Sequence, residues 1–330
     1  MNGKEIVKAA MKFQTPERMP LGFSWNGVCD YHGVGWRQIG TGDRNILRTE
    51  DEWGCTWGRS EVRNMGTVVG NPVDSWAKLD SYKWPDPDDP KLYEGMEAQF
   101  TNGCEEKFIT CGIFMLLFER MHAVRGFSNT LEDLYCEREK IEMLADRIVE
   151  YDLRIIENMR SRFPGQIDGF GFSDDWGTET AAFISPKLFE EFFTPRYKRI
   201  CDACHDAGWL VRIHSCGKIN EFIELFSRAG MDCIESLQPR LLGIEEIGQK
   251  YAGKICFAAS CDIQHTMPFK SDAEIEEEAK LLIGCWGTDK GGFIPADYGD
   301  NEAVGVSNEK RLHMLGSFVK HDRWGKKSEI

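Results

Sequence analysis

One segment, residues 209–217, has the sequence WLVRIHSCG and decides the fold class. Its apolar beginning, residues 209–213, predicts a buried β-strand. Helical patterns precede this strand at residues 186–207 and follow it at residues 218–229. A strand between two helices is the repeating unit of a mainly parallel sheet, so the segment predicts an α/β protein.

The same alternation runs along the chain. It predicts strands at residues 19–25, 107–112, 166–172, 209–214, 232–237, 254–259 and 291–296, with a weaker eighth at 67–70. Helices are expected at residues 130–162 (two helices), 186–207, 218–229, 243–250, 272–285 and 301–319, and Ser185 and Ser271 are expected to cap two of them. Eight strands with intervening helices favour a closed (β/α)8 TIM barrel over an open doubly wound sheet. No GxGxxG motif follows the first strand, which argues against a dinucleotide-binding fold.

A barrel of this kind accommodates all 330 residues as a single domain. Residues 26–106 form an irregular elaboration that carries five tryptophans and the proline-rich stretch 84–90. This insertion is expected to form either a small satellite core or a lid and docking surface near the barrel mouth.

Composition restricts the class of partner. The net charge of −14 argues against nucleic-acid binding. The first residues lack the apolar core of a signal peptide, and no apolar run is long enough to span a membrane. The twelve cysteines show no repeating spacing, so we expect reduced thiols and a cytoplasmic protein.

The chemistry is predicted at the carboxyl ends of the strands. His214 and Cys216 are two positions apart where a strand meets its loop, so both side chains face the same way and could supply half of a zinc site. A buried cysteine beside a locally hydrogen-bonded histidine is the alternative. The third ligand could be Cys261, Asp297, Glu235 or Asp174, with Asp297 and Cys261 weakly favoured.

Carboxylates stand at two further strand ends. Asp174 and Asp175 directly follow the strand predicted at 166–172, and Glu235 lies near the end of the strand at 232–237. Neighbouring carboxylates are unfavourable when both are buried, so at least one is expected to face water, a cation or a proton donor. We predict a catalytic role for these three residues, although one of the aspartates could instead cap the following helix.

Several of these segments resemble the uroporphyrinogen decarboxylase superfamily, and within it the corrinoid-linked methyltransferases. The matching residues are 15–20 (TPERMP), 174–177 (DDWG), 184–186 (ISP), 195–198 (PRYK), 214–217 (HSCG), 260–264 (SCDIQ), 267–269 (MPF) and 291–294 (GGFI). The likeness is strongest from residue 168 to residue 300 and weak between residues 26 and 106. It implies a (β/α)8 barrel with its active site at the mouth.

The resemblance also implies a zinc ion held by a His-x-Cys pair, which His214 and Cys216 match, and by a later cysteine. The segment expected to carry that cysteine, residues 294–300, reads IPADYGD. This departure argues against a thiol-methylating, coenzyme M type of activity, although a carboxylate could complete a variant site. The decarboxylase branch is expected to carry arginines just after the first strand, whereas residues 22–30 contain none.

The resulting hypothesis is a zinc-assisted methyltransferase. It would move a methyl group between a small substrate (a methyl ether, methanol, a methylamine or a thiol) and a corrinoid, or cobalamin, carried by a partner protein. One alternative is a metal-independent decarboxylase or lyase acting on another substrate. A second alternative is a barrel that binds ligands but has lost catalysis.

Overall fold

A computed structural model of the chain describes residues 1–37, 48–59 and 66–325. The chain divides into two compact units. Unit 1 comprises Met1–Val34, Phe100–Gly112 and Gly165–Ile330, and unit 2 comprises Gly35–Gln99 and Ile113–Pro164. Most of the predicted irregular elaboration therefore lies in unit 2, where residues 113–164 join it. The single domain over residues 1–330 stays a prediction.

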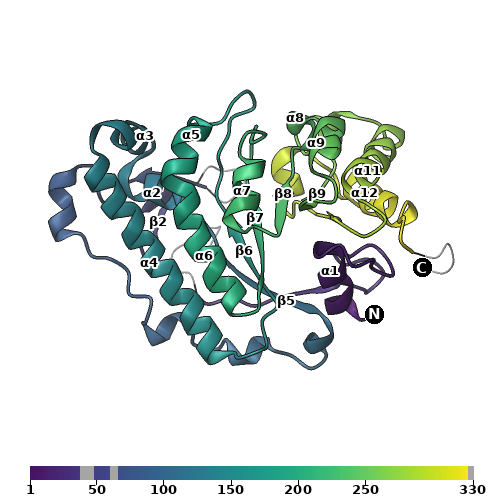
Figure 1. Ribbon diagram of the computed structural model, residues 1–330, viewed down its shortest axis with the longest axis horizontal. Helices are drawn as coiled ribbons and strands as arrows, with labels where there is room; N and C mark the ends of the chain where they lie inside the picture. The colour runs from purple at the N-terminus through teal and green to yellow at the C-terminus, as the bar shows by residue number, and fades with distance from the viewer. Residues whose placement is uncertain (38–47, 60–65, 326–330) are drawn as a thin grey trace. The chain divides into compact units, whose positions relative to one another are not determined.

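Unit 1 is built on a seven-stranded parallel sheet, part of which is seen in Figure 1. In sheet order its strands are β1 (Tyr31–Gly33), β5 (Phe108–Ile113), β6 (Gly169–Ser173), β7 (Leu210–His214), β8 (Cys233–Ser236), β9 (Cys256–Ala259) and β10 (Phe293–Pro295). Six of these strands confirm predicted ones, because their ends lie within three residues of the expected ends.

The sheet is curled around an apolar interior. Strands β1 and β7 are separated by two other strands in the sheet order, yet the guanidinium of Arg212 in β7 lies 6.0 Å from the ring centroid of Tyr31 in β1. Such a contact across the concave face requires strong curvature. The described part of unit 1 therefore forms a TIM-barrel-like α/β fold, with seven strands in its sheet.

Two predicted strands do not belong to this sheet. Within the part of the chain that the structure describes, residues 19–25 form no strand apart from a single bridge between Trp25 and Val28. The segment still lies next to the ends of the sheet, since a Cβ at Gly22 would be 3.0 Å from the Pro295 carbonyl oxygen and 4.0 Å from the Tyr31 ring. Two hydrogen bonds from Asp30 explain the irregular backbone: its amide donates to the Leu21 carbonyl and its carboxylate accepts from the Leu21 amide.

The helices of unit 1 alternate with the strands, as the sequence predicts. They are α1 (Gly3–Met11), α5 (Pro186–Leu188), α6 (Thr194–Asp206), α7 (Ile223–Ala229), α8 (Pro239–Leu242), α9 (Ile244–Tyr251), α10 (Thr266–Phe269), α11 (Asp272–Trp286) and α12 (Asn308–Lys320). Shorter turns are the 3-10 helices η4 (Cys104–Glu106) and η6 (Asn301–Val304) and the π-helical turn η5 (Phe189–Phe193). Ser185 and Ser271 cap α5 and α11, which confirms both predicted helix starts.

Helix α1 fills the amino-terminal end of the curled sheet. Its apolar face, including Val7 and Ala10, packs in one core cluster with Phe108, Leu210 and Cys256, each of which begins a strand. Its lysines also reach Asp168 just before β6: Lys8 Nζ lies 2.6 Å and Lys4 Nζ 3.1 Å from the carboxylate. Because α1 occupies that end, the polar groups of the interior are left to the carboxyl ends of the strands.

Unit 2 has its own sheet and its own core. Strands β2 (Arg48–Glu50), β3 (Thr56–Gly58) and β4 (Thr67–Gly70) pair antiparallel, so the weak strand predicted at 67–70 exists but lies outside the barrel sheet. The helices are α2 (Phe118–Arg125), α3 (Phe127–Cys136), α4 (Arg138–Arg162) and the 3-10 helices η1 (Trp76–Ser81), η2 (Pro90–Leu92) and η3 (Glu97–Gln99). The two helices α3 and α4 confirm the pair predicted at residues 130–162.

The tryptophans of unit 2 serve mainly as core. Trp53 and Trp57 are 2% and 1% exposed, and both surround the buried carboxylate of Asp51, which accepts from Trp57 Nε1 at 3.0 Å and from Arg120 at 3.0 Å. This arrangement is a satellite core with a central ion pair. A lid or docking role for the insertion stays a prediction.

None of the described helices is long and apolar enough to cross a membrane. All twelve cysteines are free thiols.

Candidate metal centre

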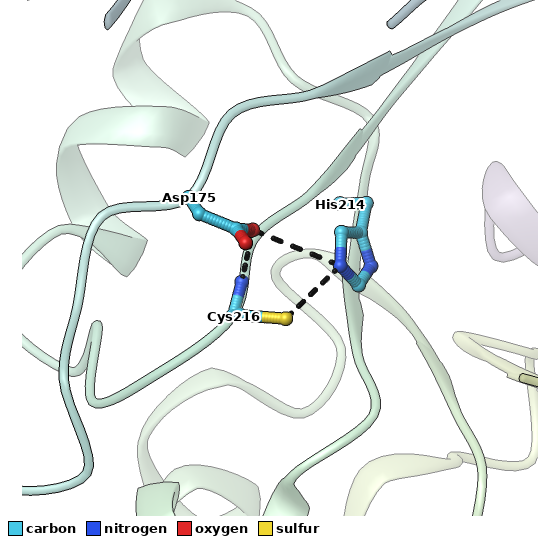
Figure 2. A group of neighbouring side chains, drawn as sticks. All are labelled: Asp175, His214 and Cys216. Atoms are coloured by element: carbon cyan, nitrogen blue, oxygen red, sulfur yellow. Dashed lines mark hydrogen bonds and ion pairs between the residues drawn. The ribbon is translucent and has the colours of Figure 1, made fainter. Parts of the chain in front are cut away.

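Two adjacent strands of unit 1 carry the candidate site. Ser173, the last residue of β6, is in register with His214, the last residue of β7. Asp175 lies two residues after Ser173, and Cys216 lies two residues after His214. Both therefore come from the loops at the carboxyl end of the sheet. Figure 2 shows the side chains of Asp175, His214 and Cys216 converging there.

Backbone contacts fix the two loops against each other. The Cys216 amide donates to Asp175 Oδ1 at 2.7 Å, and the Lys218 amide donates to the Thr178 carbonyl at 2.8 Å. Gly217 has φ +84°, and a Cβ at this position would lie 2.2 Å from the Gly177 carbonyl oxygen. Only glycine fits such an approach without displacing the loop, which explains the glycine that ends the HSCG segment.

The three side chains offer one ligand atom each, all within 4.8 Å of one another. His214 Nε2 lies 3.3 Å from Cys216 Sγ and 3.8 Å from Asp175 Oδ1. Tetrahedral zinc with ordinary N, O and S ligand distances places its ligands about 3.3–3.8 Å apart. The donor set is therefore suitable for zinc, and three protein ligands would leave one position open for a substrate.

The other ring nitrogen of His214 faces a carboxylate, an arrangement that orients metal-binding histidines. His214 Nδ1 lies 3.4 Å from Glu235 Oε2, and Glu235 in turn lies 3.6 Å from Arg212 Nη1. Burial alone would raise the pKa of Glu235, but the charges of Arg212 and His214 lower this pKa to about 2. Burial would likewise lower the pKa of His214, whereas its contacts with Cys216 and Glu235 raise that pKa well above its ordinary value.

Asp174, the neighbour of Asp175, points elsewhere. Its side chain is fully buried and accepts a short hydrogen bond from the Tyr197 hydroxyl of α6, which also accepts from Trp176 Nε1 at 2.9 Å. The Asp174 amide donates to the His214 carbonyl at 3.0 Å. The structure thus assigns Asp174 a position in the loop framework, and its catalytic role stays a prediction.

The two favoured third ligands lie outside the donor set. Cys261 is fully buried, and its thiol lies 3.5 Å from the Ile275 carbonyl of α11. Asp297 accepts from Arg311 Nε at 2.8 Å and from Asn301 Nδ2 at 3.1 Å. Among the described residues, Asp175 completes the grouping with His214 and Cys216 instead. A ligand role for Cys261 or Asp297 stays a prediction.

Sequence reasoning missed three residues of this neighbourhood. Gln238 Oε1 accepts from the Gly217 amide at 2.8 Å and so supports the cysteine loop. Burial raises the pKa of Tyr298, and the charges of Cys216 and Asp300 raise it further, which keeps the phenol protonated close to the donor set. The sequence could have indicated Arg212 as a site residue, because it precedes His214 by two residues and its side chain therefore lies on the same face of the strand.

Comparison with known proteins relates the sequence to a family. The profile of uroporphyrinogen decarboxylase (URO-D) matches residues 46–294. None of the curated proteins matches the sequence.

Among solved structures, a methyltransferase from Methanosarcina mazei aligns with a TM-score of 0.67 and 12% identity, over 97% of this chain and 99% of that chain. A D-psicose 3-epimerase from Clostridium cellulolyticum H10 aligns with a TM-score of 0.37 and 8% identity, over 74% of this chain and 85% of that one. The likeness to the methanogen protein shows a shared fold. Because the profile match covers most of the sequence, the chain belongs to the uroporphyrinogen decarboxylase (URO-D) family.

Proposed function

We propose that this chain is a methyltransferase that moves a methyl group between a small substrate and a corrinoid carried by a partner protein, with zinc held by Asp175, His214 and Cys216. The observation that carries the proposal is the donor set itself: a nitrogen, a sulfur and an oxygen within 4.8 Å at the carboxyl end of the sheet. Membership of the URO-D family and the fold shared with a methyltransferase support it.

In this proposal the residues of the chain would bind the metal and orient its histidine ligand. Asp175, His214 and Cys216 would hold the metal, and Glu235 would keep the His214 ring turned so that Nε2 faces the other two donors. Zinc, when bound, supplies a Lewis acid that polarises an oxygen or stabilises a thiolate. Glu235 contacts Arg212 and His214, and Asp175 lies in the donor set, so both carboxylates would position the metal site, and a departing oxygen would take its proton from water.

Transfer to free cob(I)alamin tests the proposal. Purified protein supplied with zinc would be mixed with reduced cobalamin and, separately, with methanol, methyl ethers, methylamines and methyl thioethers, and methylcobalamin would be followed by its absorbance. We expect transfer from at least one oxygen-linked donor and its loss after chelation. Cys216→Ala should abolish transfer, whereas Cys261→Ala, which removes a thiol outside the donor set, should retain it. No methylcobalamin from any donor would contradict the proposal.

A metal-independent decarboxylase or lyase is the second candidate, because the family profile is that of a decarboxylase. The first arginine of the chain, Arg18, is already engaged, since its guanidinium donates to both carboxylate oxygens of Asp30 at 2.7 and 2.6 Å. A substrate with many carboxylates would therefore find little free positive charge in this segment. Carbon dioxide release that survives chelation would favour this candidate. Tight binding of a corrinoid protein without any turnover would favour a binding barrel.

A further inference from the structure

One cation faces the interior of the curled sheet beside the donor set. Arg212 precedes His214 by two residues in β7, so the two side chains leave the same face of the strand. Its Nη1 lies 3.6 Å from Glu235 Oε1, and its guanidinium carbon lies 6.0 Å from the centroid of the Tyr31 ring. The side chain nevertheless keeps 34% of its surface accessible. Arg212 is therefore held in place on one side and open on another.

The hydrogen-bonding capacity of Arg212 is not filled by protein. Over residues 1–37, 48–59 and 66–325, no hydrogen bond from its guanidinium to a protein group is found, and the 3.6 Å separation from Glu235 is longer than a hydrogen bond. Arg125 shows the contrast, because it donates to Asp133 at 2.8 Å and to the Asp74 carbonyl. A guanidinium carries five N–H donors in a fixed fork that matches an oxyanion. Inside a sheet, such donors left free point to an anionic ligand.

From this geometry we infer that Arg212 binds a carboxylate on the substrate, so that the methyl donor or acceptor is a small carboxylic acid. The inference rests on the methyl transfer proposed above and names its substrate class. Residues two apart in a strand are about 7 Å apart, so the carboxylate and the methyl-bearing atom would be separated by a few bonds. The chain carries a net charge of −14 and repels anions at long range, so binding an acid requires a local cation of this kind.

Tyr31 and Glu235 prepare Arg212 for that ligand. The Tyr31 ring lies against the guanidinium and is itself packed edge-on against Phe108, with ring centroids 5.4 Å apart, so it forms a fixed wall. Glu235 contacts one end of the guanidinium only. A substrate carboxylate could therefore take up the remaining N–H groups while the pair with Glu235 persists. Water would fill these positions in the free protein.

A chain-length series of matched ligands tests the inference by binding alone. Methoxyacetate, 3-methoxypropanoate and 4-methoxybutanoate would be compared with their neutral amides by isothermal titration calorimetry, on zinc-supplied wild-type protein. We expect at least one acid to bind about tenfold or more tightly than its amide, because hydrogen bonds to charged groups are among the strong ones. Equal binding of every acid and its amide, or no acid binding at millimolar concentration, would overturn the inference.

Variants locate the recognition. Arg212→Gln should lose the preference for the acid, and Arg212→Lys, which keeps the charge without the fork, should retain part of it. Arg228→Gln is the matched control, because Arg228 pairs with Glu190 at 2.7 Å on the surface and its loss changes the net charge by the same amount. Circular dichroism and thermal melting would verify that each variant is folded. A preference for acids that persists in Arg212→Gln would overturn the inference.

The test of carboxylate binding by Arg212 can fail or succeed independently of the test of methyl transfer. An acid preference that depends on Arg212, together with no methylcobalamin from any donor, would reject the transferase and keep the carboxylate site. Transfer from neutral donors at rates equal to those of the acids would keep the transferase and reject the carboxylate site.

Discussion

Removing the Asp175 carboxylate should reduce zinc binding while leaving the fold intact. Wild-type protein at a free zinc concentration one hundred times the dissociation constant gains about 2.7 kcal/mol of stability. For a cooperative unit of roughly two hundred residues this corresponds to a rise in Tm of about 5–10 °C. If Asp175→Ala weakens zinc binding about a hundredfold, the same zinc concentration gives about 0.4 kcal/mol and a shift of about 1–2 °C.

The measurement is the difference in Tm with and without zinc, combined with metal content per chain. Using the difference removes any general destabilisation, so variants of unequal stability remain comparable. His214→Ala and Cys216→Ala should behave like Asp175→Ala. Cys261→Ala is the control: its buried thiol contacts the Ile275 carbonyl, so the variant should melt earlier yet keep the full zinc shift.

Two results would refute this reasoning. A full zinc shift in Asp175→Ala, together with its loss in Cys261→Ala, would show that the third ligand is the thiol. No zinc shift and no bound metal in the wild type would refute the metal centre as a whole.

Three further predictions follow from single contacts. Glu235→Gln should weaken zinc binding about 10–100-fold, measured by competition with a chelator, because the charge behind the His214 ring is lost. Gly217→Ala should lower the free energy of unfolding in urea by roughly 1–3 kcal/mol more than Gly27→Ala does. Both glycines have positive φ, but of the two only Gly217 would place a Cβ 2.2 Å from a backbone oxygen. Burial alone would raise the pKa of Asp297, but the hydrogen bond from Arg311 holds that pKa below its ordinary value. The ionised carboxylate therefore stabilises the fold above about pH 4, and this stabilisation is lost as the pH falls. The stability lost in Asp297→Asn should accordingly become smaller in acid, while the zinc content of the variant stays unchanged.

Six of the seven strands in the sheet of unit 1 could be predicted because their signal is local, whereas β1 (Tyr31–Gly33) was not predicted. Runs such as residues 254–259 are apolar, short and bounded by helical patterns, and β9 forms there. The strand predicted at residues 19–25 is wrong for a tertiary reason. The Asp30 carboxylate binds the Leu21 amide and the Arg18 guanidinium, and this side-chain network replaces the backbone ladder that a strand would need. Apolar pattern alone does not reveal such a competitor.

The convergence of His214 and Cys216 was predicted from the two-residue period of a strand, but β7 ends at His214, and the Cys216 amide is instead held in the following loop by Asp175. The third donor was not predicted. Asp174 and Asp175 are adjacent and chemically identical, and their roles separate because one side chain meets Tyr197 of α6 while the other meets the Cys216 amide of the neighbouring loop. That choice depends on the register of β6 against β7, which no single strand encodes.

A carboxylate in place of a second thiolate bears on the substrate. A donor set of His214, Cys216 and Asp175 has the same formal charge as one with two cysteines, but a carboxylate oxygen is a harder and weaker electron donor than sulfur. A zinc ion bound by this set would receive less charge, which would favour activation of an oxygen-bound methyl group over stabilisation of a substrate thiolate. The loop that supplies Asp175 follows β6, the strand next to the one that carries Arg212, so the donor set and the Arg212 guanidinium lie on neighbouring strands. Both features favour an oxygen-containing acid over a neutral thiol as the small substrate.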